Sequence, residues 1–100
     1  MDKTDALRIA RQYASLIQTN FDCRQIFLFG SYTKETWQDE SDIDIAVILK
    51  EFENPLDIQL KLMQLRRRID SRIEPHPFRE KDFHQTNPIV NEIIKYGYSI

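Results

Sequence analysis

Residues 24–49 read RQIFLFGSYTKETWQDESDIDIAVIL, two apolar runs on either side of a polar connection. The first run ends at Phe29 and predicts a buried strand that Gly30 interrupts. The second run, from Ile43 to Leu49, is apolar at every position after Asp44. Such a run is typical of a central strand that is covered on both faces, and it places this strand in the middle of a sheet.

Amphipathic patterns outside this stretch predict three helices. The first runs from Ala6 to Ile17, with apolar residues three or four positions apart, and ends near Asn20. The last covers Pro88 to Lys95 and stops at Gly97. A helix between them opens at Asn54-Pro55, where proline suits the first turn. Its expected buried face contains Ile58, Leu62, Leu65 and Ile69, widened by Leu56, Leu60 and Met63.

Two shorter segments complete the predicted order of elements. Residues Arg72 to Phe78 resemble a third strand, but Pro75 and Pro77 cannot donate hydrogen bonds to a neighbouring strand. We therefore expect this strand to lie at an edge of the sheet or to end early. Ser31 to Trp37 has room for one or two helical turns before a polar connection.

Length and composition indicate one domain over residues 1–100, since compact domains commonly run from about 50 to 200 residues. A net charge of −2 does not support broad binding to nucleic acid, and no apolar run approaches the roughly 20 residues that cross a bilayer. Cys23 is the only cysteine and cannot form an internal disulfide, and nothing at the N-terminus resembles a signal peptide. We therefore expect a cytoplasmic protein, with Cys23 as a passive residue.

The chemistry is concentrated in Gly30-Ser31 and Asp42-Ile43-Asp44, which ten residues separate. A strand that runs into Gly30 can turn tightly and bring its backbone close to an anion, because glycine has no side chain. Ser31 supplies a hydroxyl, and a helix that begins there would direct free N–H groups toward a phosphate. Lys34, about one turn further on, could add a positive charge.

Asp42 and Asp44 share one face of a strand, because side chains alternate along an extended backbone. Carboxylates held together repel one another unless a cation lies between them, and a hard divalent ion such as Mg²⁺ suits them. The alternative is that Asp42 ends a surface turn and Asp44 is solvated at a strand end. The buried run directly after Asp44 argues against it, because an unpaired carboxylate there would be costly.

These residues resemble the signature of the DNA polymerase β superfamily of nucleotidyltransferases, Gly-Ser followed at this distance by Asp-x-Asp. The resemblance implies an α/β (α+β) fold, with a small mixed sheet of three to four strands flanked by helices. It also implies two Mg²⁺ ions and ATP as the substrate. The metal ligands and catalytic residues would be Asp42, Asp44 and Glu74, with Asp70 a weaker candidate for the third carboxylate, and the phosphates would lie on Gly30, Ser31 and Lys34.

The chain departs from the family pattern at two positions. Glu74 stands where aspartate is common, and Glu35 stands where related sequences have glycine, which adds a negative charge beside the expected triphosphate. A solvated edge residue is the alternative role for Glu74.

The small size of the chain resembles that of minimal nucleotidyltransferases that act as antitoxins. Their partner is a helical toxin of the HEPN class, and they transfer AMP from ATP to a tyrosine of that toxin, which implies a hetero-oligomer and a protein adenylyltransferase. Two alternatives remain open: an antitoxin that neutralises its partner by binding alone, and an enzyme that modifies a small hydroxylated molecule such as an aminoglycoside.

Three further groups of residues have both a structural and a functional interpretation. His76 would share a strand face with Glu74, where a structural hydrogen bond is the more common role and contact with nucleotide or metal the alternative. Tyr32 and Trp37 could stack on a base or pack beneath the loop. His84 has no motif around it. The basic cluster of Arg66, Arg67, Arg68 and Arg72 could offset a helix dipole or meet a triphosphate.

Overall fold

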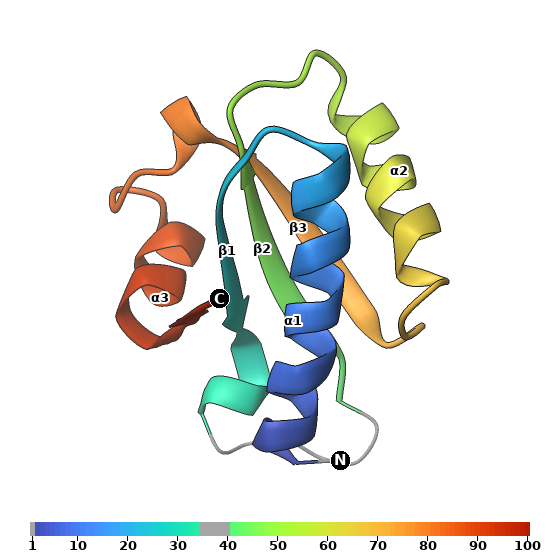
Figure 1. Cartoon of the computed structure of the whole chain (residues 1–100). Helices are drawn as coiled ribbons and strands as arrows, with labels where there is room; N and C mark the ends of the chain where they lie inside the picture. Colours follow the sequence, from blue (N-terminus) through green and yellow to red (C-terminus); the bar gives the residue numbers. More distant parts are fainter. Residues whose placement is uncertain (1, 35–40) are drawn as a thin grey trace.

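The computed structural model describes residues 2–34 and 41–100 and contains a four-stranded sheet with helices on both faces (Figure 1). The strand order is β3-β2-β1-β4, with β1 antiparallel to β2 and β4, and β3 parallel to β2. This mixed α+β architecture confirms the predicted fold class. The elements are α1 (Lys3–Asn20), β1 (Cys23–Phe29), the 3-10 turn η1 (Gly30–Thr33), β2 (Ile43–Leu49), α2 (Pro55–Arg66), β3 (Ile73–Arg79), the 3-10 turn η2 (Glu80–Asp82), α3 (Pro88–Tyr96) and β4 (Tyr98–Ser99).

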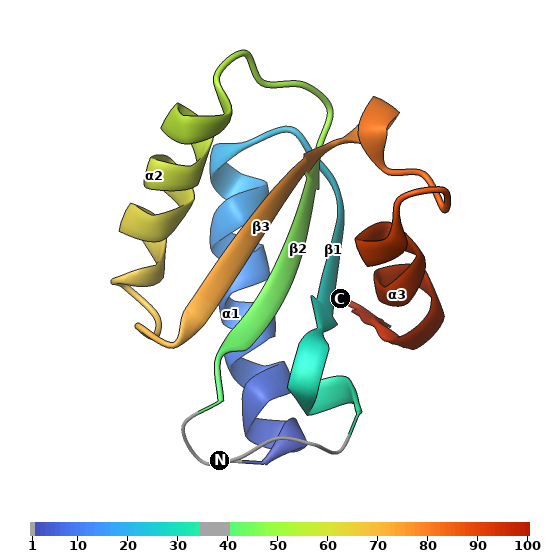
Figure 2. The same cartoon turned by 180° about the vertical axis from the view of Figure 1, so that it is seen from behind.

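The central strand β2 has apolar residues on both faces because each face is covered by a different layer. Ile43, Ile45 and Val47 pack with α1 and α2 in the larger core. Ala46 and Ile48 pack with Ile93 of α3 in a smaller core on the other face. Seen from behind, α3 lies beside β1 and no helix stands in front of β2 or β3 (Figure 2). Asp44, which lies on the same face as Ala46 near the start of β2, is 25% exposed.

Helices α1 and α2 are held together through a buried tyrosine. Tyr13 is fully buried, and its hydroxyl donates a hydrogen bond of 2.7 Å to the carbonyl oxygen of Leu62. Asn54 caps α2, since its side chain accepts hydrogen bonds from the N–H groups of Leu56 and Asp57. The cap confirms that α2 opens at Asn54-Pro55.

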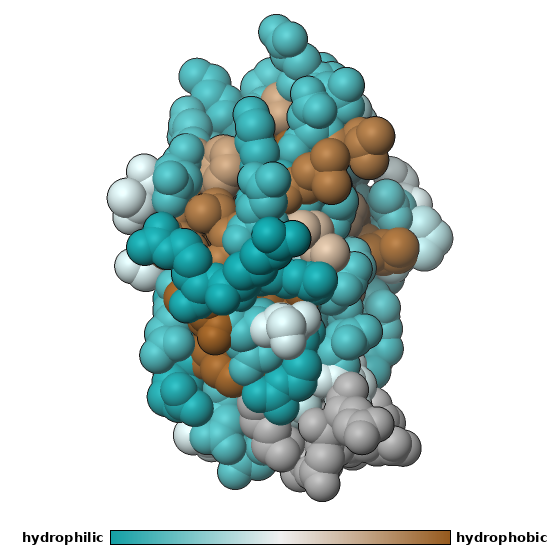
Figure 3. Space-filling model, turned by 90° about the vertical axis from the view of Figure 1, so that its right-hand side faces the viewer, coloured by the Kyte–Doolittle hydropathy of each residue, from teal (hydrophilic) through white to brown (hydrophobic). Residues whose placement is uncertain are grey.

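The predicted buried face of α2 is only partly right. Ile58 and Leu62 lie in the core, but Leu56 and Leu60 are 67% and 53% exposed, so the prediction that they widen the buried face is wrong. Two residues along a helix turn the side chain by about 200°, which carries Leu60 to the side opposite Ile58. The side of the molecule on which α2 lies is mostly hydrophilic, with hydrophobic atoms in separate patches (Figure 3).

The edge position predicted for β3 is confirmed. The carbonyl oxygens of Ile73 and Pro75 accept hydrogen bonds of 2.8 and 3.0 Å from Arg66 and Gln59, both on α2. These backbone groups therefore face away from β2. Pro77 has the same parity as Pro75, so the missing N–H of each proline falls on the free edge, where no neighbouring strand needs it.

Gly97 ends α3 for a reason other than a left-handed backbone. Its φ is −71°, but an added Cβ would overlap the carbonyl oxygen of Ile93 and lie 3.3 Å from that of Leu28. The chain then turns into β4, which pairs with Phe27 and Leu28 of β1.

No helix in residues 2–34 or 41–100 has the length and apolar composition to cross a bilayer.

Candidate active site

The two halves of the sequence motif meet at one end of the sheet. Asp44 is the second residue of β2, and its register partners are Phe29 on β1 and Glu74 on β3. Adjacent strands lie about 4.8 Å apart, so Asp44 is flanked by both. Gly30 directly follows Phe29 and begins η1. The register thus brings Gly30, Asp44 and Glu74 to the same end of three neighbouring strands.

Gly30 is required by its backbone conformation and by its contact with Asp44. Its φ is +82°, in the left-handed region that favours glycine. An added Cβ would overlap Oδ2 of Asp44 and lie 3.1 Å from its Cγ. Thr33 supports the turn, because its hydroxyl donates a hydrogen bond of 2.7 Å to the carbonyl oxygen of Gly30. The glycine therefore lets the turn close against the carboxylate.

The other oxygen of Asp44 contacts a histidine of β3. His76 Nε2 lies 3.0 Å from Oδ1 of Asp44, and the Phe29 ring meets the His76 ring edge to face at a centroid distance of 5.0 Å. The side chains of Asp44 and His76 are 25% and 38% exposed, so both can be reached from solvent. The sequence indicated a structural hydrogen bond as the more common role of His76. Its position two residues after Glu74 predicted that the two side chains share one face of the strand.

Each candidate for the third carboxylate contacts an arginine. Glu74, the register partner of Asp44, has its Oε2 3.8 Å from Nη1 of Arg66. Asp70 lies outside β3, and both of its oxygens accept hydrogen bonds from the Arg72 guanidinium, at 3.0 and 2.8 Å. Those hydrogen bonds hold the pKa of Asp70 below its usual range. Asp70 therefore lies in the connection before β3, and Glu74 is the candidate that lies on the strand beside Asp44.

We expect Asp70→Asn to lower stability without changing the candidate active site. Arg72 is 40% and Asp70 17% exposed, so the pair lies near the surface without being fully solvated. Exposed ion pairs contribute up to about 1 kcal/mol, and we expect a loss of about that size at pH 7. Because the folded-state pKa of Asp70 is lowered, this stability is present above the ordinary aspartate pKa and disappears as the pH falls through the lowered value. Urea denaturation at a series of pH values from 7 downward checks this, since the difference in stability between wild type and variant should shrink as the pH falls below the ordinary aspartate pKa.

The remaining motif residues lie around this contact. Asp42 is exposed directly before β2, and Ser31 is half-buried in η1. Lys34 forms an ion pair with Glu92 of α3 and therefore points to that helix. Glu35 and Trp37 lie outside the residues that the structure describes. Beside η1 is an open hollow of about 570 Å³, lined by Lys3, Thr33, Lys34, Tyr96 and Tyr98.

Several side chains for which the sequence allowed both a structural and a functional role make structural contacts. Tyr32 is fully buried in the larger core, and its hydroxyl donates to the carbonyl oxygen of Ser41 at 3.4 Å, so it is a packing residue. Arg66 and Arg72 bind Ile73 and Asp70, as described above. Burial raises the pKa of the Cys23 thiol to about 11, which keeps the thiol protonated and agrees with a passive residue.

The donor chemistry around Asp44 fits a hard divalent cation, since Asp44, Glu74 and the nearby Asp42 all present carboxylate oxygens. Within residues 2–34 and 41–100, no three acidic, histidine or cysteine side chains are arranged closely enough to hold an ion. Binding of a metal would require these carboxylates to come closer together and Glu74 to leave its contact with Arg66.

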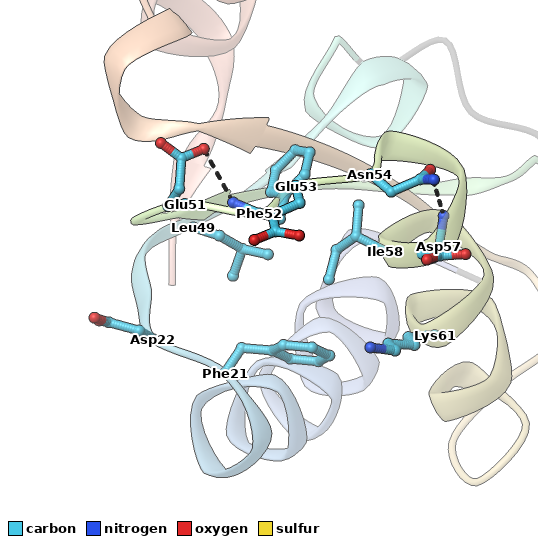
Figure 4. A pocket seen from close by; sticks show the side chains of 10 residues that line it. All are labelled: Phe21, Asp22, Leu49, Glu51, Phe52, Glu53, Asn54, Asp57, Ile58 and Lys61. Atoms are coloured by element: carbon cyan, nitrogen blue, oxygen red, sulfur yellow. Dashed lines mark hydrogen bonds between the residues drawn. The ribbon is translucent and has the colours of Figure 1, made fainter.

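A second hollow, of about 360 Å³, lies at the opposite end of the sheet (Figure 4). It includes Leu49, the last residue of β2, five positions and roughly 17 Å from Asp44. Glu51 on its rim accepts a hydrogen bond from the N–H of Phe52 and pairs with Arg79 at 2.8 Å. This hollow is therefore separate from the motif. Its lining comprises Phe21, Asp22, Leu49, Glu51, Phe52, Glu53, Asn54, Asp57, Ile58 and Lys61.

A mixed sheet with a Gly-Ser turn closed against an aspartate of the next strand defines the nucleotidyltransferase class of fold. The chain matches the family model "Polymerase beta, Nucleotidyltransferase" over residues 11–99, and it belongs to this family. No curated protein matches the chain significantly in sequence.

Solved structures share the fold at low sequence identity. A candidate nucleotidyltransferase from Sulfolobus solfataricus is 19% identical, with a TM-score of 0.70, over 97% of this chain and 80% of that one. A complex of a tri-AMPylated HEPN toxin with an MNT antitoxin from Shewanella oneidensis matches with 19% identity and a TM-score of 0.62, over 94% and 70%. A toxin–antitoxin structure with AMP-PNP matches with 19% identity and a TM-score of 0.58, over 99% and 72%.

Proposed function

We propose that residues 1–100 act as a single Mg²⁺-dependent nucleotidyltransferase domain that transfers AMP from ATP to a hydroxyl of a HEPN-type toxin, with a tyrosine as the acceptor. The protein would serve as the antitoxin of that partner in the cytoplasm. The observation that carries the proposal is the closure of the Gly30 turn against Oδ2 of Asp44. Family membership and the complexes that other proteins of this fold form with HEPN toxins support it.

In this proposal the carboxylates hold the metal and the turn holds the phosphates. Asp42, Asp44 and Glu74 would bind two Mg²⁺ ions, which when bound lower the pKa of the attacking hydroxyl and stabilise the departing pyrophosphate. The hydroxyl oxygen bonds to the α-phosphorus, the bond from that phosphorus to the bridging oxygen breaks, and Glu74 takes the hydroxyl proton. Glu74 must leave Arg66 for this role.

The hollow beside η1 provides a place for the nucleotide. Its two lysines, Lys3 and Lys34, suit phosphate groups, and the rings of Tyr96 and Tyr98 suit a base. Lys34 would exchange Glu92 for a phosphate, which is the stronger acceptor. Gly30 adjoins Asp44, and Thr33 of the same turn lines the hollow, so Gly30 and Ser31 would contact the phosphates nearest the metal.

The test is to incubate the chain with labelled ATP, Mg²⁺ and the product of the neighbouring gene, and to follow AMP on the partner by mass spectrometry. We expect one or more tyrosines of the partner to gain AMP with the wild type. Asp42→Asn should transfer at least about a hundredfold more slowly, because a metal ligand is lost. Asp22→Asn, which changes an exposed carboxylate at the opposite end of the sheet, is the matched control and should transfer normally. The absence of transfer by the wild type would overturn the proposal.

A second candidate function is neutralisation of the partner by binding alone. The pairing of Glu74 with Arg66 and of Lys34 with Glu92 favours it, because two side chains needed for catalysis are occupied. The exposed Leu56 and Leu60 of α2 offer an apolar surface for contact. If this function is correct, the Asp42→Asn chain neutralises the toxin as well as the wild type does in a growth assay.

A further inference from the structure

We propose that His76 is a positioning residue that donates a hydrogen bond from Nε2 to Oδ1 of Asp44 and thereby directs Oδ2 toward the cation. This inference rests on the proposed function, since it concerns the same site. The contact joins two strands and measures 3.0 Å.

The direction of the hydrogen bond follows from the chemistry of the two groups. An ionised aspartate only accepts, so Nε2 of His76 must carry the proton. Oδ1 of Asp44 is then engaged by the imidazole, while Oδ2 lies against the Gly30 turn. Oδ1 is therefore occupied by the hydrogen bond to His76. Oδ2, which lies at the Gly30 turn, is the oxygen available to a ligand at that turn.

The position of the imidazole is fixed by its surroundings. Pro75 and Pro77 flank His76, and each proline holds its backbone φ near about −65°. The register places His76 beside Ala46, the next residue on the same face as Asp44. The nearly buried ring of Phe29 meets the imidazole at 65° and 5.0 Å. A fixed donor can set the angle of a neighbouring carboxylate, which a mobile one cannot.

Removing this donor should release the carboxylate. The terminal torsion of aspartate is broad and roughly two-fold, so the plane of the Asp44 carboxylate is not fixed by the side chain alone. Hydrogen-bond partners of metal ligands commonly contribute 10- to 100-fold to metal affinity. We expect the effect of His76 to fall in that range.

The test measures Mn²⁺ affinity of the full chain without nucleotide or partner, by electron paramagnetic resonance of free Mn²⁺. His76→Phe should weaken Mn²⁺ binding about 10- to 100-fold. His76→Gln can place its amide nitrogen near the position of Nε2 and should stay within about threefold of the wild type. His84→Phe is the matched control, because His84 is exposed and lies outside the site, and it should bind as the wild type does. Thermal unfolding checks that each variant is folded.

Three results would overturn the inference: His76→Phe binding Mn²⁺ as tightly as wild type, His76→Gln binding as weakly as His76→Phe, or a wild type that binds no Mn²⁺. The first shows that the hydrogen bond is not needed, and the second that the ring matters rather than the donor. If these affinities behave as expected and no AMP reaches the partner, the proposed function fails while the role of His76 stands.

Discussion

Asp44→Asn is expected to reduce AMP transfer by on the order of a thousandfold or more, because charge stabilisation by a bound metal is worth several kcal/mol and each 1.36 kcal/mol is about tenfold in rate. The asparagine keeps the size of the side chain and an oxygen that can accept from His76. It removes the negative charge beside Gly30, to which the cation would bind. The change is therefore chemical rather than a disturbance of packing.

The measurement is the initial rate of AMP transfer to the partner, followed by mass spectrometry with saturating ATP and Mg²⁺. Asp22→Asn again serves as the control for loss of one carboxylate. Asparagine has the size of aspartate and can still accept a hydrogen bond from His76, so we expect the melting temperature of Asp44→Asn to change little. Transfer by Asp44→Asn at the wild-type rate would rule out a metal site at Asp44 and with it the enzymatic proposal.

Gly30→Ala is expected to damage both stability and activity. A left-handed backbone costs a residue with a Cβ roughly 1–2 kcal/mol, and φ at Gly30 is +82°. The new methyl group would also overlap Oδ2 of Asp44 and push the carboxylate away from the turn. We therefore expect a stability loss of about 1–3 kcal/mol and at least a hundredfold slower transfer.

Gly97→Ala is a well-matched control for this variant. An added methyl group at Gly97 also overlaps a neighbouring atom, here the backbone carbonyl oxygen of Ile93, but it lies at the end of α3, away from Asp44. Both variants should unfold at lower urea concentration, and only Gly30→Ala should also lose Mn²⁺ affinity. Equal Mn²⁺ affinity for the two variants would contradict the role given to the Gly30–Asp44 contact.

Much of the fold could be predicted from residue patterns alone. The bounds of β2 are as predicted, because its apolar run is uninterrupted and lies between polar segments. The prolines of β3 correctly indicated an edge strand. The two-residue strand β4 could not be predicted, since it is too short to show a periodicity and depends on pairing with Leu28. The exposure of Leu60 was missed because α2 is apolar on two sides.

The candidate site could be predicted less completely than the fold. Local sequence placed Gly30 and Asp44 at adjoining strand ends, and the register brings them into contact. The contact of Glu74 with Arg66 joins separate elements, and no sequence spacing indicated it. The parity of Glu74 and His76 indicated that they share a strand face, but it did not indicate the contact of His76 with Asp44. The catalytic and metal-binding roles of Asp42, Asp44 and Glu74 stay predictions that the experiments above address.

The prolines of β3 restrict how another protein can attach to this sheet. An extended segment that adds to an edge needs free N–H groups along it, and the outward-facing positions 75 and 77 have none. The outward carbonyl oxygens of Ile73 and Pro75 already accept from side chains of α2. The prolines therefore hinder a partner from continuing the sheet beyond β3, so recognition on this flank depends on side chains. The same feature hinders two copies of the chain from joining through their β3 edges.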